Sequence, residues 1–124
     1  MKKQIMKEKI LVVDDEEGIR LLYKEELEEE GLDVHIAASG EEALKKLEKD
    51  KYSLIVLDIK MPGIDGIEVL RRIKEKWKSL PVILCTAYHH YKQDFGTWAS
   101  DAYVVKSSDL KELKDTIKGI LGSR

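Results

Sequence analysis

Residues 54–58 read Leu-Ile-Val-Leu-Asp, a short apolar run that ends in a carboxylate. An earlier run, residues 10–13, reads Ile-Leu-Val-Val and ends in the same way at Asp14 and Asp15. Apolar runs of this length are typical of strands buried on both faces of a parallel sheet. If both runs are such strands, their three aspartates meet at one edge of the sheet. Mutual repulsion there opposes ionisation unless a cation is present.

The rest of the chain continues this alternation of strands and helices. The expected strands are residues 10–13, 34–37, 54–57, 82–86 and 102–105; the expected helices are residues 16–30, 39–47, 67–77 and 110–121, with a short or irregular helix between Thr86 and Asp101. The inner face of the first helix is predicted by apolar residues at helical spacing: Ile19, Leu22, Tyr23 and Leu27. Strands alternating with helices indicate right-handed crossovers and an α/β fold with helices on both faces of a parallel sheet.

Local signals mark the ends of several expected helices. Ser39 followed by Glu42 predicts a capping box, and Gly31 predicts a C-terminal stop. Ser108 or Asp109 is available as the N-cap of the last helix.

Two other strands also end in chemically useful residues, Thr86 and Lys106. In open parallel sheets the functional crevice lies beyond the carboxyl ends of the strands. Asp14 or Asp15, together with Asp58, would offer hard oxygen ligands to Mg2+. A carboxylate screened by a cation can attack a phosphoryl group in line, and Asp58, which stands alone at its strand end, is the expected nucleophile. The Thr86 hydroxyl and the Lys106 ammonium would then contact phosphoryl oxygens.

These motifs together resemble the CheY-like receiver domain of two-component response regulators. The resemblance covers essentially the whole chain and rests on Asp14-Asp15, on Asp58 leading into Met61-Pro62-Gly63 and Asp65-Gly66, on Thr86-Ala87 and on Lys106. It implies a flavodoxin-like (βα)5 fold with strand order 2-1-3-4-5. It also implies phosphorylation of aspartate by a histidine kinase or a histidine phosphotransfer protein, and a protein target downstream.

The resemblance further implies roles for single residues. Mg2+ would be bound through Asp15, Asp58 and the backbone carbonyl of Lys60, with Asp14 acting mainly through a metal-bound water. On phosphorylation Thr86 would move toward the phosphoryl group and Tyr103 would change rotamer. Period-two alternation places Tyr103 on the face opposite Val104 and Lys106, so it can respond to Thr86 without entering the site.

Three departures from the family pattern affect these expectations. Ser107 follows Lys106 where the family usually has proline, and a cis bond before serine would cost about 2.5 to 4 kcal/mol. A trans bond is therefore expected, with Lys106 placed differently. The stretch from Thr86 to Lys106 is also shorter than is usual in the family. The helix expected between Thr86 and Asp101, and any dimer surface built on it, would therefore differ from the family pattern. Finally, Lys60 and Tyr88 stand where the family tunes hydrolysis, and these bulky side chains predict a long-lived phosphoryl group.

Two other functions of this fold class fit the sequence less well. A flavodoxin needs a phosphate-cradling loop after its first strand, and the acidic residues 14–17 would repel that phosphate. A phosphatase with an aspartate nucleophile keeps a second aspartate two residues later, where this chain has Lys60, so we expect no turnover enzyme. A receiver that docks without being phosphorylated remains an alternative.

Length and charge bound the remaining possibilities. The 124 residues favour a single domain, 1–124, acting as a monomer or weak dimer. With 22 basic and 24 acidic residues the net charge is −2, so neither nucleic acid nor an anionic membrane is expected as a direct partner. The single cysteine, Cys85, lies in an apolar run, which fits a reducing cytoplasm. A stand-alone receiver and a receiver domain of a larger regulator are both compatible with the sequence.

Overall fold

The protein is described by a computed structural model that covers residues 7–87, 99–107 and 109–122. These residues form a five-stranded parallel sheet in the order β2-β1-β3-β4-β5. The strands are Lys9–Val13 (β1), Asp33–Ala37 (β2), Leu54–Leu57 (β3), Val82–Thr86 (β4) and Ala102–Val105 (β5). The strand order confirms the flavodoxin-like arrangement.

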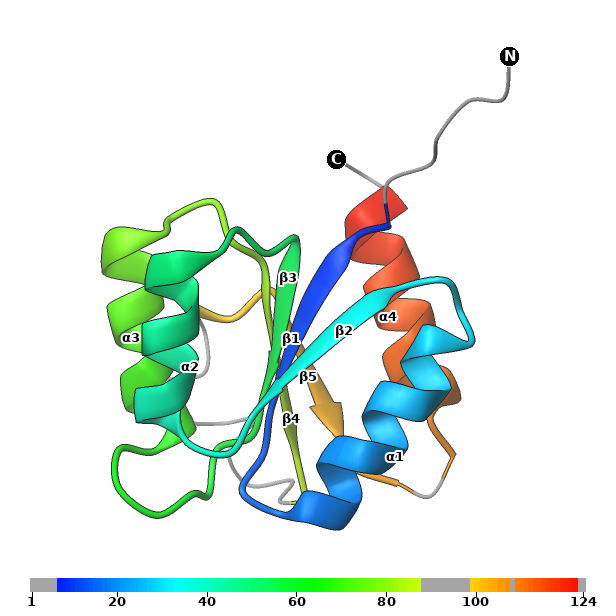
Figure 1. Ribbon diagram of the computed structural model, residues 1–124, viewed down its shortest axis with the longest axis horizontal. Helices are drawn as coiled ribbons and strands as arrows, with labels where there is room; N and C mark the ends of the chain where they lie inside the picture. Colours follow the sequence, from blue (N-terminus) through cyan, green and yellow to red (C-terminus); the bar gives the residue numbers. More distant parts are fainter. Residues whose placement is uncertain (1–6, 88–98, 108, 123–124) are drawn as a thin grey trace.

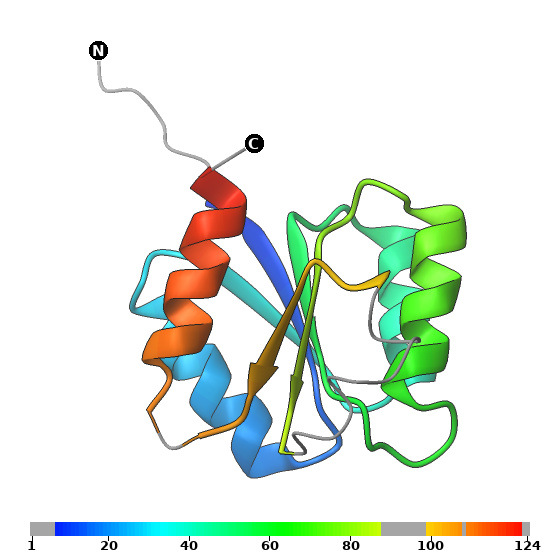
Figure 2. The same ribbon diagram turned by 180° about the vertical axis from the view of Figure 1, so that it is seen from behind.

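Helices cover both faces of this sheet, as Figures 1 and 2 show from opposite sides. The described helices are Glu17–Glu28 (α1), Gly40–Lys49 (α2), Gly66–Lys76 (α3) and Lys111–Gly122 (α4). Helices α1 and α4 lie on one face, and α2 and α3 lie on the other. The helix expected between Thr86 and Asp101 falls on residues 88–98, outside the described residues. In the described ranges, no helix is both long enough and apolar enough to cross a bilayer.

The alternation of side chains along each strand supplies two separate cores. In β1, Leu11 and Val13 pack toward α2 and α3, whereas Ile10 and Val12 pack toward α1 and α4. These four residues are at most 1% exposed. Because both faces of the strand are covered, apolar residues occupy every position, which explains the uninterrupted run in the sequence.

The helix-end signals act largely as predicted. Ser39 Oγ accepts a hydrogen bond from Glu42 N at 3.1 Å. Glu42 returns the contact one residue earlier than a standard capping box, because its carboxylate accepts from Ala38 N at 2.7 Å. Gly31 has φ 90°, which favours glycine after a helix. Asp109 Oδ1 accepts from Lys111 N at 2.9 Å at the start of α4.

The inner face of α1 is narrower than its sequence predicts. Tyr23 and Leu27 are buried, and Ile19 is partly buried against the same core. The prediction for Leu22 is wrong, because its side chain is 41% exposed, and Leu21 beside it is 55% exposed. Helical spacing identifies residues that share a face, but how far the sheet extends under that face depends on tertiary packing.

Candidate functional site

The three aspartates predicted to meet at the sheet edge do so. Asp58 N donates to Val13 O at 3.0 Å, so the residue after β3 is held against the end of β1. One carboxylate oxygen each from Asp14, Asp15 and Asp58 lies within 4.8 Å of the other two. Asp14 and Asp58 are 2% and 5% exposed, whereas Asp15 is exposed. The cluster is therefore two buried carboxylates with a third open to solvent.

Lys106 brings a positive charge to this cluster from the end of β5. Its Nζ lies 2.5 Å from Asp14 Oδ2 and 3.3 Å from Asp58 Oδ2. Its backbone N donates to Thr86 O at 2.7 Å, which continues the β4–β5 pairing beyond the strand. The described residues contain no cis peptide bond. With this trans backbone, the Lys106 ammonium reaches both aspartates.

Burial makes Asp58 a weaker acid than an exposed aspartate. Burial raises the pKa of Asp58 to about 6, Lys106 opposes this rise, and the charge of Asp14 adds to it. For Lys106, burial lowers the pKa, but the hydrogen bond to Asp14 and the charges of both aspartates outweigh burial and raise it. The single positive charge of Lys106 does not neutralise the negative charges of two buried carboxylates. The site therefore favours the binding of an additional cation.

Thr86 and Tyr103 occupy the positions that the strand pattern predicts. Thr86 is fully buried at the end of β4, next to β3, and pairs with Val105 in the sheet register. Tyr103 packs partly buried against the core beneath α2 and α3, whereas Val104 belongs to the core beneath α1 and α4. The structure thus separates Tyr103 from the face to which Val104 points.

The loop after β3 is shaped by Gly66. A Cβ built on Gly66 would overlap the backbone oxygen of Asp58, so only glycine allows the first turn of α3 to approach so closely. Gly66 N donates to Ile59 O at 2.8 Å, and Asp65 Oδ1 caps α3 by accepting from Glu68 N at 2.9 Å. Side-chain capping and close backbone packing together fix where Asp58 lies relative to α3.

Lys60 lies on this same loop, and its side chain is exposed. Tyr88, the other residue expected to shield the site, lies outside the described residues.

Sequence reasoning missed Arg20. Its Nη1 donates to the backbone oxygen of Asp14 at 2.8 Å, reaching back from α1 to the end of β1. Asp14 Oδ1 also accepts from Glu16 N at 2.9 Å. No sequence motif distinguishes Arg20 from other helical arginines, and only its position one turn into α1 makes the contact possible.

The donor set fits Mg2+. The ion prefers oxygen ligands and retains several waters, so one or two carboxylates at an accessible edge suffice to bind it. Asp15 supplies an exposed carboxylate, while Asp14 and Asp58 supply buried ones. In the part of the chain that the structure describes, no sulfur or imidazole ligand of the kind preferred by softer metals joins this cluster.

Comparison with known proteins identifies the family. Residues 10–118 match the family model described as the response regulator receiver domain. The chain belongs to the receiver domain family. It is 39% identical over 119 residues to sporulation initiation phosphotransferase F of Bacillus subtilis, and the match covers 94% of this chain and 96% of that protein. It is 42% identical over 118 residues to the alkaline phosphatase synthesis transcriptional regulatory protein PhoP of the same organism.

This receiver domain spans 49% of the length of PhoP, about half of that regulator. Among solved structures it resembles the response regulator TrrA of Thermotoga maritima in complex with Mg(2+)-BeF, with 53% identity, a TM-score of 0.89, and coverage of 91% of this chain and 98% of that one. A second structure shows TrrA in complex with the histidine kinase ThkA; there the identity is 54%, the TM-score 0.88, and the coverage 92% and 98%.

Proposed function

We propose that Asp58 of this receiver domain accepts a phosphoryl group from a histidine kinase or a histidine phosphotransfer protein in the presence of Mg2+. The observation that carries the proposal is the convergence of Lys106 on Asp14 and Asp58 at the carboxyl edge of the sheet. Two findings on relatives support it. TrrA has been crystallised with Mg(2+)-BeF, and it also forms a complex with a histidine kinase.

In this reaction a carboxylate oxygen of Asp58 attacks phosphorus as the bond to the donor imidazole breaks, and that bond's electron pair stays on the imidazole nitrogen. Asp15, Asp58 and the backbone carbonyl of Lys60 would hold Mg2+, with Asp14 acting through a water. When bound, the ion neutralises charge on the carboxylates and the phosphoryl oxygens. Burial of Asp58 excludes water around the attacking oxygen.

Lys106 and Thr86 would serve the phosphoryl oxygens once the bond has formed. Lys106 already lies within hydrogen-bond distance of both buried aspartates, so a small shift of its ammonium suffices to contact a phosphoryl oxygen. Thr86 ends β4, the strand that pairs with β3, and we expect its hydroxyl to contact a phosphoryl oxygen on Asp58.

The output of phosphorylation is a change of surface. We propose that movement of Thr86 lets Tyr103 change rotamer and remodels a surface that includes β5 and α4. The segment after Tyr88, expected to share in this change, lies outside the described residues. Such a switch requires two conformers of similar energy, of which the phosphoryl group favours one. A downstream protein then recognises the changed surface.

The chain's own chemistry would be limited to acquiring and slowly losing this phosphoryl group. Lys60 stands on the loop beside Asp58 with an exposed side chain, and it can occupy the approach of an attacking water. Together with Tyr88 it predicts a long-lived acyl phosphate. Fast Mg2+-dependent loss of the phosphoryl group by the isolated protein would contradict this part of the proposal.

Incubation with acetyl phosphate and Mg2+, followed by a phosphate-affinity gel, tests the central claim. The wild-type band should be retarded, whereas Asp58→Ala and samples containing a chelator should migrate as unmodified protein. Asp50→Ala is a matched control, because it removes an exposed carboxylate at the opposite end of the sheet, before β3. An unretarded wild-type band would instead favour a receiver that docks without phosphorylation.

A further inference from the structure

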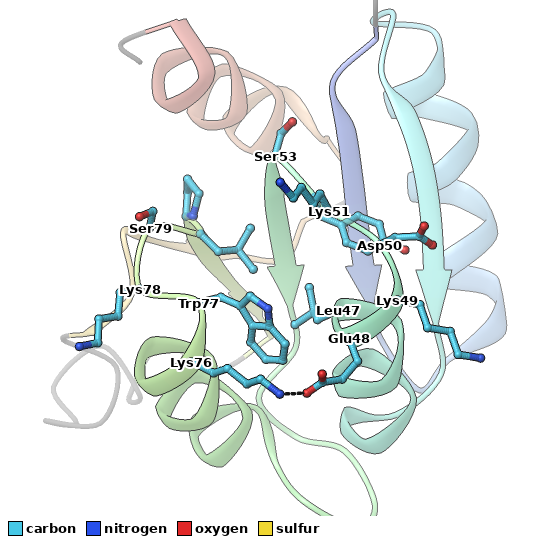
Figure 3. A pocket seen from close by; sticks show the side chains of 13 residues that line it. Leu47, Glu48, Lys49, Asp50, Lys51, Ser53, Lys76, Trp77, Lys78 and Ser79 are labelled. Atoms are coloured by element: carbon cyan, nitrogen blue, oxygen red, sulfur yellow. Dashed lines mark hydrogen bonds and ion pairs between the residues drawn. The ribbon is translucent and has the colours of Figure 1, made fainter.

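A second candidate binding site lies at the end of the sheet opposite Asp58. A pocket of about 700 Å3 opens between the loop that joins α2 to β3 and the loop that joins α3 to β4 (Figure 3). Both loops immediately precede their strands, whereas the aspartate cluster follows the strands. Its volume falls in the range of about 300 to 1,000 Å3 that is usual for small-molecule sites.

The pocket has an aromatic and apolar lining. Trp77, at the end of α3, points into it and is partly buried, and Leu47, Leu80 and Pro81 also line it. The Lys76 ammonium lies 5.1 Å from the centroid of the Trp77 ring. An ion pair between Lys76 and Glu48 links α3 to α2 beside Trp77 and closes that side of the pocket (Figure 3).

The rim of the pocket is basic, although the protein as a whole has a net charge of −2. Four lysines and two acidic residues line it: Lys49, Lys51, Lys76, Lys78, Glu48 and Asp50. Both acids already have cationic partners, because Glu48 pairs with Lys76 and Asp50 lies 4.0 Å from Lys9. Within the described ranges, no carboxylate lies within 4 Å of the ammonium groups of the other three lysines. Their charge is therefore available to an anion.

One lining residue, Tyr52, has a buried hydroxyl with no hydrogen-bond partner among the described residues. Leaving a buried polar group unpaired costs about 1 to 3 kcal/mol. This hydroxyl is itself shielded from solvent, so only an acceptor that displaced its neighbours would remove the penalty.

We propose that this pocket binds a small planar anion, an aromatic ring that carries a phosphate or carboxylate. The ring would pack against Trp77 and the apolar lining, and the anionic group would lie near Lys51. Lys78, on the facing loop, is directed away from Trp77 in Figure 3 and would reach the anion by a change of rotamer. A neutral aromatic would leave the lysines unused, and a free inorganic anion would leave the apolar lining exposed. Both parts of the ligand are needed for binding.

Fluorescence of Trp77 tests the proposal. The chain has two tryptophans, so Trp98→Phe leaves Trp77 as the sole indole emitter. This protein is titrated with adenosine monophosphate, adenosine and inorganic phosphate at physiological salt and without Mg2+. Adenosine monophosphate should quench the emission with a Kd below about 1 mM, whereas adenosine and phosphate should each bind at least about tenfold more weakly.

Charge variants separate this pocket from general attraction to lysines. Lys51→Glu should weaken binding of adenosine monophosphate at least about fivefold. Lys45→Glu makes the same change of charge on the exposed side of α2, away from the pocket lining, and should leave the Kd within about twofold. Equal effects of the two variants, or binding of adenosine as tight as that of the nucleotide, would overturn the proposal. Loss of phosphorylation at Asp58 would not affect it, because Asp58→Asn should bind the nucleotide equally.

Discussion

Replacing Asp58 by asparagine should stabilise the Mg2+-free protein, and the gain should depend on pH. Burial raises the pKa of Asp58 from its ordinary 3.8 to about 6. Each pKa unit corresponds to about 1.4 kcal/mol, so the ionised side chain lowers the free energy of unfolding by about 3 kcal/mol. Asparagine has nearly the same shape and no charge, and it removes this penalty.

The sign follows from proton binding. Because the pKa is raised in the folded state, that state binds the Asp58 proton more tightly than the unfolded chain does, and stability falls as the pH rises from about 4 to about 6. Asp58→Asn should therefore match wild type near pH 4 and exceed it by about 3 kcal/mol near pH 8. Saturating Mg2+ should stabilise wild type near pH 8 and narrow the difference.

Urea denaturation followed by far-ultraviolet circular dichroism, in buffers from about pH 4 to about pH 8 with a chelator, measures this difference. Asp50→Asn is the matched control, since it removes an exposed carboxylate at the far end of the sheet and should change stability by less than about 0.5 kcal/mol. An Asp58→Asn variant that is no more stable than wild type near pH 8, or whose advantage is the same at every pH, would refute burial of the Asp58 charge as the cause.

Three further outcomes are expected. Gly66→Ala should lower the free energy of unfolding by about 3 kcal/mol, because the added Cβ would overlap the backbone of Asp58. Gly119→Ala is the control and should not destabilise α4, because a Cβ added there meets nothing within 4 Å. Urea denaturation measures both changes. Lys106→Met should slow phosphorylation by acetyl phosphate at least about tenfold, measured on the phosphate-affinity gel, and an unchanged rate would exclude a role for the ammonium. Lys60→Asn should shorten the lifetime of the acyl phosphate several-fold, followed by loss of the retarded band, and an unchanged lifetime would remove Lys60 as a shield against water.

The strands illustrate what local sequence can predict. Residues 54–57, 82–86 and 102–105 form strands with the predicted bounds, because uninterrupted apolar runs of this length can be buried only between two helical layers. The polar residue after each run then marks a strand end, and in a parallel sheet all such ends lie at one edge. Three aspartates, Thr86 and Lys106 could be assigned to one site on that basis.

The contacts within the site could not be predicted in the same way. The Lys106 ammonium reaches both aspartates from a strand whose pairing with β4 continues to Lys106 N, and no local feature of the sequence specifies that contact. Arg20 carries no sequence signal and is defined only by its contact with the Asp14 carbonyl. The exposure of Leu22 likewise depends on how α1 sits on the sheet, which its helical spacing does not specify.

By itself the sequence determined the α/β alternation, the strand ends and the family, because each depends on short-range patterning of apolar and polar residues. Only the tertiary structure decided how far the pKa of the Asp58 carboxyl is raised and which side chain, Lys106, partly offsets that rise. The pKa of Asp58 depends on burial and on distances to Asp14 and Lys106, which lie 44 and 48 residues away along the chain. Such distances arise from strand order and helix packing, and these are properties of the whole fold.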